Sequence, residues 1–205
     1  METVVKHVLC TLAFAVLLTG CAATNPPLPV YTDPFSNLVN QSSAGVPVDK
    51  PMTPELPIGL ILSDNVETYV QYAKAGQEGM KSYGALTNTV AVADIDPTFV
   101  ANRVLVMLKN RYPDMVLVPD FNQAIAEGLR SVVLLDFRVG GPGTSGTTTT
   151  VDVGLFFFDA GMIPRTHITG HGSAVVPYPA WDPQVQVATD QAMAELQPKF
   201  DAFIQ

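Results

Sequence analysis

Two histidines offer the clearest candidate chemistry in the sequence. His167 and His171 alternate with Thr169 and Ser173, so an extended strand would place all four side chains on one side. Imidazole is a frequent metal ligand and general base, which suggests a hydrolase or a metal-dependent enzyme. At about 3.3 Å per residue, the two histidine backbones lie ~13 Å apart, too far to share one ion unless Gly170 permits a bulge. We therefore expect a polar, solvent-facing strand without metal ligands, and keep an enzyme centred on the two histidines as the alternative.

A glycine-rich stretch gives a second candidate for ligand chemistry. Residues 141–148 fit the spacing of a phosphate-binding loop, with glycines five residues apart and threonines after the second. Thr147 stands where that loop needs a lysine to neutralise phosphate, and a strand is expected to follow where a helix should begin. We therefore expect a connection between strands and assign no cofactor.

Serine and aspartate residues complete no catalytic set. Ser131, Ser145 and Ser173 lack the strand-turn-helix context of an activated serine. Asp94 and Asp96 could act as an acid and base pair. Asp96 precedes a proline, however, and this order is typical of a helix start, where the carboxylate binds free amides. No catalytic residue is assigned.

Aromatic residues near the C-terminal region suggest a contact surface. Tyr178 and Trp181 lie among three prolines, in a stretch where the backbone has little freedom to lose. Rigidly held aromatics make low-entropy contacts with other proteins. We expect either a protein contact at Tyr178 and Trp181 or a cover for the edge of the core.

The N-terminus carries the pattern of an exported protein. Residues 8–18 form an apolar run of about eleven after Lys6, whereas a helix that spans a bilayer needs roughly 20. The run ends in Leu18, Thr19, Gly20 and Cys21, four residues that resemble the lipobox of bacterial lipoproteins. That resemblance implies that residues 1–20 are a signal peptide and that Cys21 is acylated, for example with palmitate, and becomes the new N-terminus. An ordinary signal peptide with a chance cysteine is the alternative.

Cysteine usage and charge exclude several classes of site. Cys10 would leave with the signal peptide and Cys21 would carry lipid, so no thiol remains for a disulfide, a zinc cluster or a nucleophile. The signal segment contains one acid and one base, Glu2 and Lys6, so the net charge of −8 is unchanged without it. This acidic balance argues against nucleic acid and against anionic lipid headgroups as partners, because recognition of either requires a basic surface.

The mature chain is expected to begin with a spacer. Residues 21–56 contain seven prolines with no sustained apolar period, which is typical of a partly extended tether. At ~3.1 Å per residue, such a tether could hold a domain several nanometres from a membrane. Tyr31 and Phe35 leave a second possibility, that they belong to a short docking segment. Residues 57–205 are expected to form one domain.

Periodicity predicts the elements of this domain. An aspartate followed by a proline predicts the start of a helix at residues 96–97 and again at 182–183, and Gly128 predicts the end of a helix. Residues 65–72 are predicted to be strand or loop. The predicted strands are 58–62, 89–93, 115–118, 132–139, 151–158 and 163–176, and the predicted helices are 96–111, 120–128 and one beginning at 182. The predicted buried stripes are Val100, Val104, Met107, Leu108 and Arg111 in the first helix, and Val185, Ala188, Ala192, Leu196, Phe200 and Phe203 in the last.

This order of elements predicts an α+β fold. We expect a mixed, largely antiparallel sheet with helices packed on one face and the C-terminal helix closing the core. Connections through helices favour parallel pairing early in the chain, and short connections favour antiparallel pairing later.

The layout as a whole resembles a group of small envelope proteins. The lipobox, the proline-rich segment and the elements from residue 88 to 203 are similar to small outer-membrane lipoproteins of the YajG-like family. The similarity is looser to the anchored domains of the CsgG, LpoB and TolB N-terminal type. No functional residue can be carried over. Ala22, where an aspartate would often retain a lipoprotein in the inner membrane, implies the periplasmic face of the outer membrane.

These observations lead to three functional hypotheses. The first is a lipid-anchored protein with a non-enzymatic binding or assembly role, whose partner is another envelope protein. The second is an envelope hydrolase or metal-dependent enzyme around His167 and His171, and alanine replacement of both would separate it from the first. The third is a carrier of a small ligand, which requires an apolar pocket.

Overall fold

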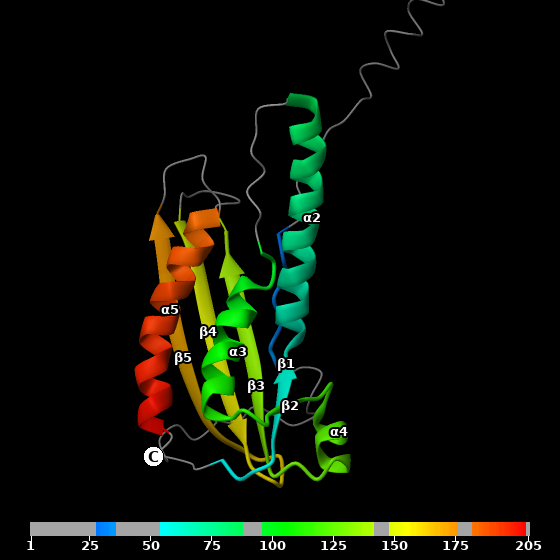
Figure 1. Cartoon of the computed structure of the whole chain (residues 1–205), viewed down its shortest axis with the longest axis vertical. Helices are drawn as coiled ribbons and strands as arrows, with labels where there is room; N and C mark the ends of the chain where they lie inside the picture. Colours follow the sequence, from blue (N-terminus) through cyan, green and yellow to red (C-terminus); the bar gives the residue numbers. More distant parts are fainter. Residues whose placement is uncertain (1–27, 36–53, 88–95, 142–147, 176–181, 204–205) are drawn as a thin grey trace, which may run out of the picture.

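Five strands and four helices make up the described part of the chain (Figure 1). The computed structural model describes residues 28–35, 54–87, 96–141, 148–175 and 182–203. The elements are β1 Ile58–Leu62, α2 Asp64–Thr87, α3 Phe99–Arg111, β2 Val116–Leu117, α4 Phe121–Ala126, β3 Ser131–Gly140, β4 Thr148–Phe158, β5 Pro164–Val175 and α5 Asp182–Phe203. Within these residues, no helix is both long enough and apolar enough to span a membrane. The strand predicted at 89–93 lies outside the described residues.

The strands form one mixed sheet in the order β2-β1-β3-β4-β5. β1 pairs in parallel with β2 and with β3, and helices supply the connections that parallel pairing requires. β3, β4 and β5 pair antiparallel, and only Asp159 to Ile163 separate β4 from β5. The predicted α+β fold with a mixed, largely antiparallel sheet is confirmed.

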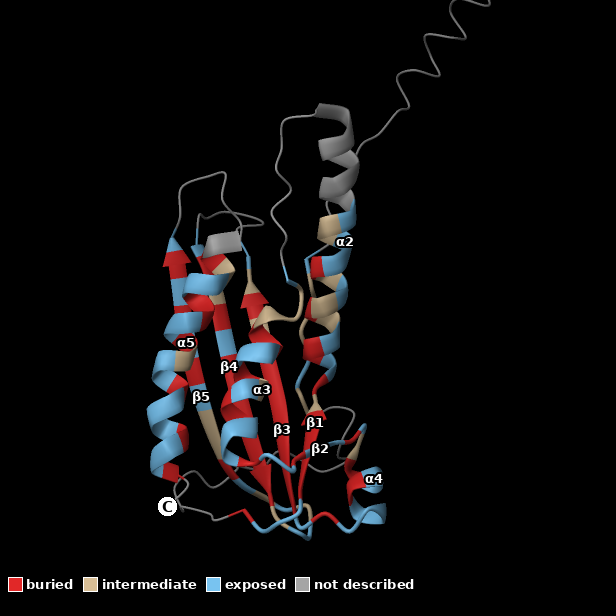
Figure 2. Cartoon of the chain, viewed as in Figure 1, coloured by how far each residue is buried: buried red, intermediate tan, exposed pale blue. Residues whose placement is uncertain are grey.

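The main hydrophobic core lies between one face of the sheet and helices α2, α3 and α5 (Figure 2). Alternate residues of β4 face it, as the predicted period of two requires. The C-terminal helix closes this core, as expected from its apolar stripe. The stripe residues that the structure buries are Val100, Val104, Met107 and Leu108 in α3, and Ala188, Ala192, Leu196, Phe200 and Phe203 in α5.

Two predicted members of these stripes differ in the structure. Arg111 is exposed, because α3 ends there and the next residue, Tyr112, takes the buried place instead. Val185 is only partly buried and packs at the border of the core. Both lie at helix ends, where a helical period no longer determines which side chain faces the sheet.

A smaller core lies on the opposite face of the sheet. The six-residue helix α4 packs there, with Phe121 edge-on to Phe158 at 4.8 Å between ring centroids. Asp120 caps α4, as predicted, by accepting a hydrogen bond from the Gln123 amide at 2.8 Å. Gly128 follows with a φ of +69°, so the predicted glycine stop is also present. The helices therefore lie on both faces of the sheet, with α2, α3 and α5 on one face and α4 on the other.

Helix α2 corrects the prediction of a strand or loop at residues 65–72. Val66, Tyr69 and Ala73 are buried on one side of the helix, and the Tyr69 ring lies 5.5 Å from that of Phe137 in β3. Helix-weakening glycines at 76, 79 and 84 hid this helix in the sequence, since each costs about 1 kcal/mol relative to alanine. Packing on β3 offsets that cost at the start of α2. The rest of the helix projects past the end of the sheet (Figure 1).

The start of α3 also differs in detail from the prediction. Asp96 does not occupy the cap position itself, because the helix begins at Phe99 and Thr98 precedes it. The Asp96 carboxylate instead accepts hydrogen bonds from the amide and the hydroxyl of Thr98, at 2.8 and 2.6 Å. These bonds stabilise the charged form and lower the pKa of Asp96. Asp96 therefore shapes the turn into the helix.

Helix α5 lies unusually close to β5 and covers its outer edge. A Cβ added to Gly172 would lie 1.9 Å from the Ala188 carbonyl oxygen, so only glycine permits this approach. Three α5 side chains, spaced four residues apart, then bind backbone groups of β5 that pair with no strand in the described part of the chain. The bonds are Ser173 N–H to Gln191 Oε1 at 3.0 Å, His171 N–H to Glu195 Oε2 at 2.9 Å, and Lys199 Nζ to the Thr169 carbonyl at 2.7 Å. These bonds protect the edge from pairing with another chain.

Candidate interaction surface

Part of the predicted spacer is docked on the domain. We call residues 28–35 the docked segment. Among the described residues, no strand pairs with β3 on the β1 side beyond the pair Leu62 and Leu135. The Tyr31 hydroxyl fills this gap, donating to the Val139 carbonyl and accepting from the Val139 amide, both at 2.9 Å. Residues 28–35 of the expected spacer therefore contact the folded domain of the same chain, which the sequence did not indicate.

Two further contacts fasten the docked segment. Thr32 and Asn65 exchange two hydrogen bonds of 2.9 Å, from the Thr32 amide to Oδ1 and from Nδ2 to the Thr32 carbonyl. At the end of the segment, the Phe35 ring meets Phe156 edge-on at 4.7 Å and Phe158 at 6.2 Å, on the smaller core. The segment thus bridges the edge of β3 and the face of the sheet that α4 covers in part.

A buried carboxylate joins the docked segment to the sheet. Asp136 of β3 is 6% exposed and accepts hydrogen bonds from Ser63 Oγ at 2.5 Å and Asn65 Nδ2 at 2.7 Å. Arg138, two residues further along the strand, places Nε 3.6 Å from Asp136 and donates to the Thr32 carbonyl at 3.0 Å. The same Asn65 amide group therefore holds both the carboxylate and the docked segment.

Titration of Tyr31 provides a test of this docking. Burial disfavours the phenolate and raises the pKa of Tyr31 from 10.0 to about 12, although its bond with Val139 opposes the shift. Because the folded pKa is the higher one, Tyr31 stabilises the docked state below pH 10, and this contribution is lost as the pH rises to about 12. We expect Tyr31→Phe to remove the tyrosinate absorbance component that titrates near pH 12. Tyr72→Phe should retain that component, and its persistence in Tyr31→Phe would contradict the assignment.

Polar side chains occupy the uncovered part of the sheet face that carries α4. Residues in register on neighbouring strands share a face, and one such row consists of Arg138, Asp152 and His171 from β3, β4 and β5. The next row consists of Asp136, Gly154 and Thr169. We call these two rows, together with His167, the polar sheet face. It is built on three paired strands, so its groups are held in fixed relative positions.

The two histidines of this surface have separate partners. His167 stacks on Phe156 at 3.9 Å between ring centroids and 6° between planes. Burial lowers the pKa of His167, and the nearby Asp136 carboxylate opposes that shift. His171 is exposed and lies with Nδ1 2.6 Å from Asp152 Oδ1. No three His, Cys, Asp or Glu side chains of the described chain are grouped so as to hold a metal ion.

No family model matches the sequence, and no curated protein matches it. Two solved structures show a distant similarity, both of a PelC dodecamer from Paraburkholderia phytofirmans. One is 13% identical with a TM-score of 0.38, and the other, a single-residue variant, is 14% identical with a TM-score of 0.35. Each alignment covers 74% of this chain and 92% of that chain. Similarity at this level identifies neither a family nor a function here, and the YajG-like resemblance stays a prediction.

The remaining candidate residues from the sequence have structural roles or fall outside the described chain. Ser131 is buried and its Oγ accepts a hydrogen bond from the Glu55 amide at 2.8 Å. Ser173 is exposed on β5, next to α5. Leu18, Thr19, Gly20, Cys21, Asp94, Ser145, Thr147, Tyr178 and Trp181 lie outside the described residues.

Sequence reasoning did not identify the acidic and basic members of the polar sheet face. Asp136 and Arg138 interrupt an apolar strand at alternate positions, and this alternation was the available signal. Their link to Asp152 depends on strand pairing and has no local signature. The resulting surface combines charges of both signs with exposed hydroxyl and imidazole groups, which suits hydrogen bonding to another molecule.

Proposed function

We propose that this chain is a lipid-anchored protein of the bacterial cell envelope, held at the periplasmic face of the outer membrane through Cys21. The observation that carries the proposal is the sequence Leu18-Thr19-Gly20-Cys21 directly after an apolar run of signal-peptide length. Ala22 after the cysteine favours the outer membrane. Several acyl chains anchor a protein stably, because each buried methylene contributes about 0.8 kcal/mol.

The docked segment bears on how far the domain would stand from its anchor. Six residues separate Cys21 from Leu28, where the docked segment begins, so seven Cα–Cα steps join the two. At ~3.6 Å per extended residue these can span at most about 25 Å. The domain would therefore lie close to the bilayer, and not several nanometres away as a free spacer of 21–56 would allow.

Replacement of the acylated residue tests this anchoring. We expect Cys21→Ser to abolish palmitate labelling and to prevent signal cleavage, because the thiol is the attachment point for lipid. After expression with a non-lipidating signal peptide, the mature serine protein should leave the membrane fraction, since no other part of it would bind the bilayer tightly. Labelling with palmitate and membrane flotation measure the two effects. Normal processing and membrane fractionation of Cys21→Ser would contradict the proposal.

The role of the anchored domain, in this proposal, is to bind another envelope protein without catalysing a reaction. The polar sheet face supports it. This surface presents Arg138, Asp152, Thr169 and His171 toward solvent from three paired strands, with the side chains of Asp152 and His171 each 57% exposed. A partner would meet groups that are already ordered, so binding would cost little conformational entropy. The net charge of −8 favours a partner with a basic or neutral contact surface.

Site-directed photocrosslinking tests the binding role. We expect a benzoylphenylalanine at Thr169, on the polar sheet face, to form an adduct with a specific envelope protein in living cells. The matched control carries the same probe at Glu127, an exposed position at the C-terminal end of α4. Mass spectrometry of the adduct identifies the partner, and Asp152→Lys should reduce its yield at least fivefold. Equal adducts from both positions, or none from Thr169, would contradict the assignment of this surface.

A further inference from the structure

We infer that two copies of this chain associate through helices α3 and α5, which lie side by side on one face of the sheet (Figure 1). We call the exposed side of these helices, within residues 99–111 and 187–201, the helix face. Its partner is a second copy of the same chain, related by a twofold axis. The inference does not depend on acylation of Cys21, and every residue of the helix face belongs to the described part of the chain.

The two helices run in the same direction and in register. In the first half of α3, Arg103 forms an ion pair with Asp190 of α5. Just past the end of α3, Tyr112 lies edge-on to Phe200 of α5, with 6.3 Å between the ring centroids. From the first contact to the second, the chain advances nine residues on one side (103 to 112) and ten on the other (190 to 200). Residues at equal steps from Arg103 and Asp190 therefore lie at nearly equal heights.

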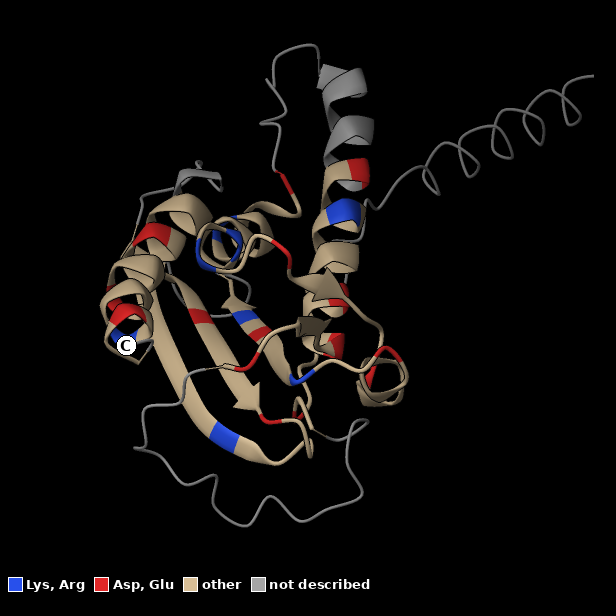
Figure 3. Cartoon of the chain, turned by 60° about the horizontal axis from the view of Figure 1, so that its bottom comes forward, with Lys and Arg blue, Asp and Glu red and all other residues tan. Residues whose placement is uncertain are grey.

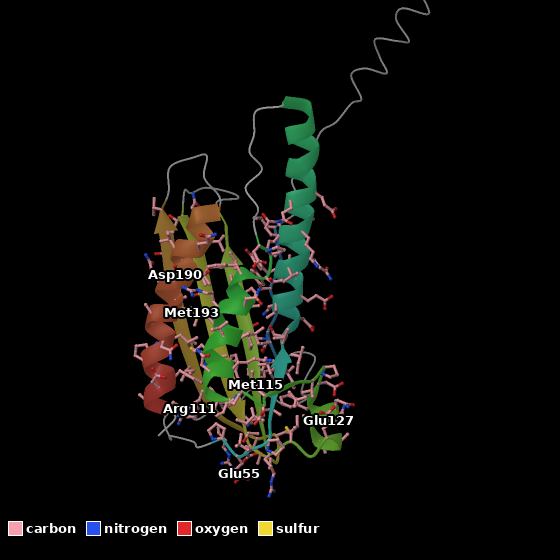
Figure 4. The ribbon with its side chains drawn as sticks, viewed as in Figure 1. Glu55, Arg111, Met115, Glu127, Asp190 and Met193 are labelled. Carbon is pink, nitrogen blue, oxygen red and sulfur yellow. The ribbon has the colours of Figure 1, made fainter. Side chains whose placement is uncertain are left out.

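Helix α3 is a basic element of an acidic protein. It contains Arg103, Lys109 and Arg111, all exposed, and no acidic residue. The nearest acids in the sequence, Asp96 and Asp114, lie before and after the helix. Figure 3 shows the basic residues of α3, and Figure 4 places Arg111 at its end. The chain as a whole has a net charge of −8, so an acidic surface is the kind of partner that this helix fits.

Helix α5 provides an acidic surface of this kind. Its described side chains include three exposed acids, Asp190, Glu195 and Asp201, and one exposed base, Lys199. Glu195 and Lys199 pair with each other and bind the edge of β5. Asp190 and Asp201 are eleven residues apart, about three turns, so they lie on the same side of the helix. A surface that is basic on one helix and acidic on the next is complementary to a rotated copy of itself.

A twofold axis parallel to the helices, running between α3 and α5, brings two such surfaces together. This axis keeps each residue at its height and places α3 of one copy on α5 of the other. Arg103 of each copy then meets Asp190 of the other, and four charges of alternating sign lie together. One turn further along, Val106 of each copy meets Ala194 of the other, and both are exposed in the single chain.

Burial of apolar and paired groups would stabilise this arrangement. Val106 and Val187 are 59% and 43% exposed, so the contact would remove apolar surface from water. The side chains of Arg103 and Asp190 are also half exposed, and water weakens an ion pair of this kind. A second copy would exclude part of that water and give each charge another opposite charge. Helices about 20 Å long make a small interface, so we expect a weak dimer.

The polar sheet face stays free in this dimer. It lies on the side of the sheet that carries α4, whereas α3 and α5 cover the other side. Two copies joined through their helix faces would therefore carry their polar sheet faces on opposite sides. The dimer could then bind two partner molecules, a consequence that rests on the proposed binding role.

Complementary charge reversals test the dimer. The chain from residue 21 onward, carrying Cys21→Ser so that it cannot be acylated, is studied by sedimentation equilibrium at increasing concentration. We expect it to dimerise, and the dimer to weaken with added salt, because ions screen the charges. Arg103→Glu sets acids against acids and Asp190→Arg sets bases against bases, so each should weaken dimerisation at least tenfold. An equimolar mixture of the two should restore it to within about threefold, because every acid again meets a base across the interface.

Lys74→Glu is the matched control, because it reverses an exposed charge on α2, outside the helix face. It should change dimerisation by less than about twofold. Circular dichroism verifies that each variant folds. If a charge reversal prevents folding, Val106→Asp takes its place, since it sets an acid against α5 without touching the ion pair, and it should also weaken the dimer at least tenfold.

Three results would overturn the inference. The first is a chain that stays monomeric up to about 1 mM, which would leave the helix face to a different protein or to solvent. The second is a dimer that no substitution in the helix face weakens, because the contact would then lie elsewhere on the surface. The third is a mixture of Arg103→Glu and Asp190→Arg that stays as weakly associated as each variant alone.

Discussion

Gly172→Val is expected to destabilise the protein by about 3 kcal/mol or more, which is a large part of the 5–15 kcal/mol typical of a domain. Any Cβ at this position would lie 1.9 Å from the Ala188 carbonyl oxygen and 2.7 Å from the Ala192 amide nitrogen. Both atoms belong to the α5 backbone, so no side-chain rotation relieves the overlap. The helix would have to move away from β5. Leu196 and Phe200 would then lose contact with the sheet.

Thermal unfolding measures this effect. For a domain of this size, 3 kcal/mol corresponds to a decrease in Tm of roughly 6–12 °C. Gly161→Ala is the matched control, because a Cβ there meets its nearest neighbour, the Asp159 carboxylate, at an ordinary 3.4 Å. Its Tm should change by no more than about 2 °C. A Gly172→Val protein as stable as Gly161→Ala would show that α5 does not pack on β5 as described.

Asp136→Ala is expected to cost about 3 kcal/mol and to release the docked segment. The substitution leaves the Ser63 hydroxyl and the Asn65 amide without their acceptor, and both side chains are nearly inaccessible to water. A buried donor that loses its partner costs about 1–3 kcal/mol. Asn65 also holds Thr32 through two hydrogen bonds, so disorder at Asn65 weakens the hold on the segment.

Two measurements follow this release. Urea denaturation gives the loss of stability, and hydrogen exchange at the Thr32 and Val139 amides, both bonded in the docked state, reports the segment. Asp152→Ala is the matched control, since it removes an aspartate from the adjoining strand whose side chain is 57% exposed. The control should lie within about 0.5 kcal/mol of the wild type, with unchanged exchange. Slow exchange at both amides in Asp136→Ala would contradict the linkage.

Local sequence patterns were sufficient for the elements whose buried side chains repeat regularly. The apolar period of α3 and α5, the alternation in β4 and the aspartate cap of α4 each depend on residues close together in the chain. These patterns determined the fold class, because elements of known type and order allow few packings. The export signal and Cys21 are likewise properties of a short sequence, and they stay predictions here.

The tertiary structure alone decided the features that depend on partners distant in the sequence. Helix α2 contains three glycines and forms because Tyr69 and Ala73 pack against β3. The docked segment has the sequence of a spacer. It is held on the domain because Tyr31 binds the amide and the carbonyl of Val139 at the edge of β3, 108 residues away. The row of Arg138, Asp152 and His171 exists only through strand register. In each case the stabilising contact is non-local, so no window of the sequence contains both of its partners.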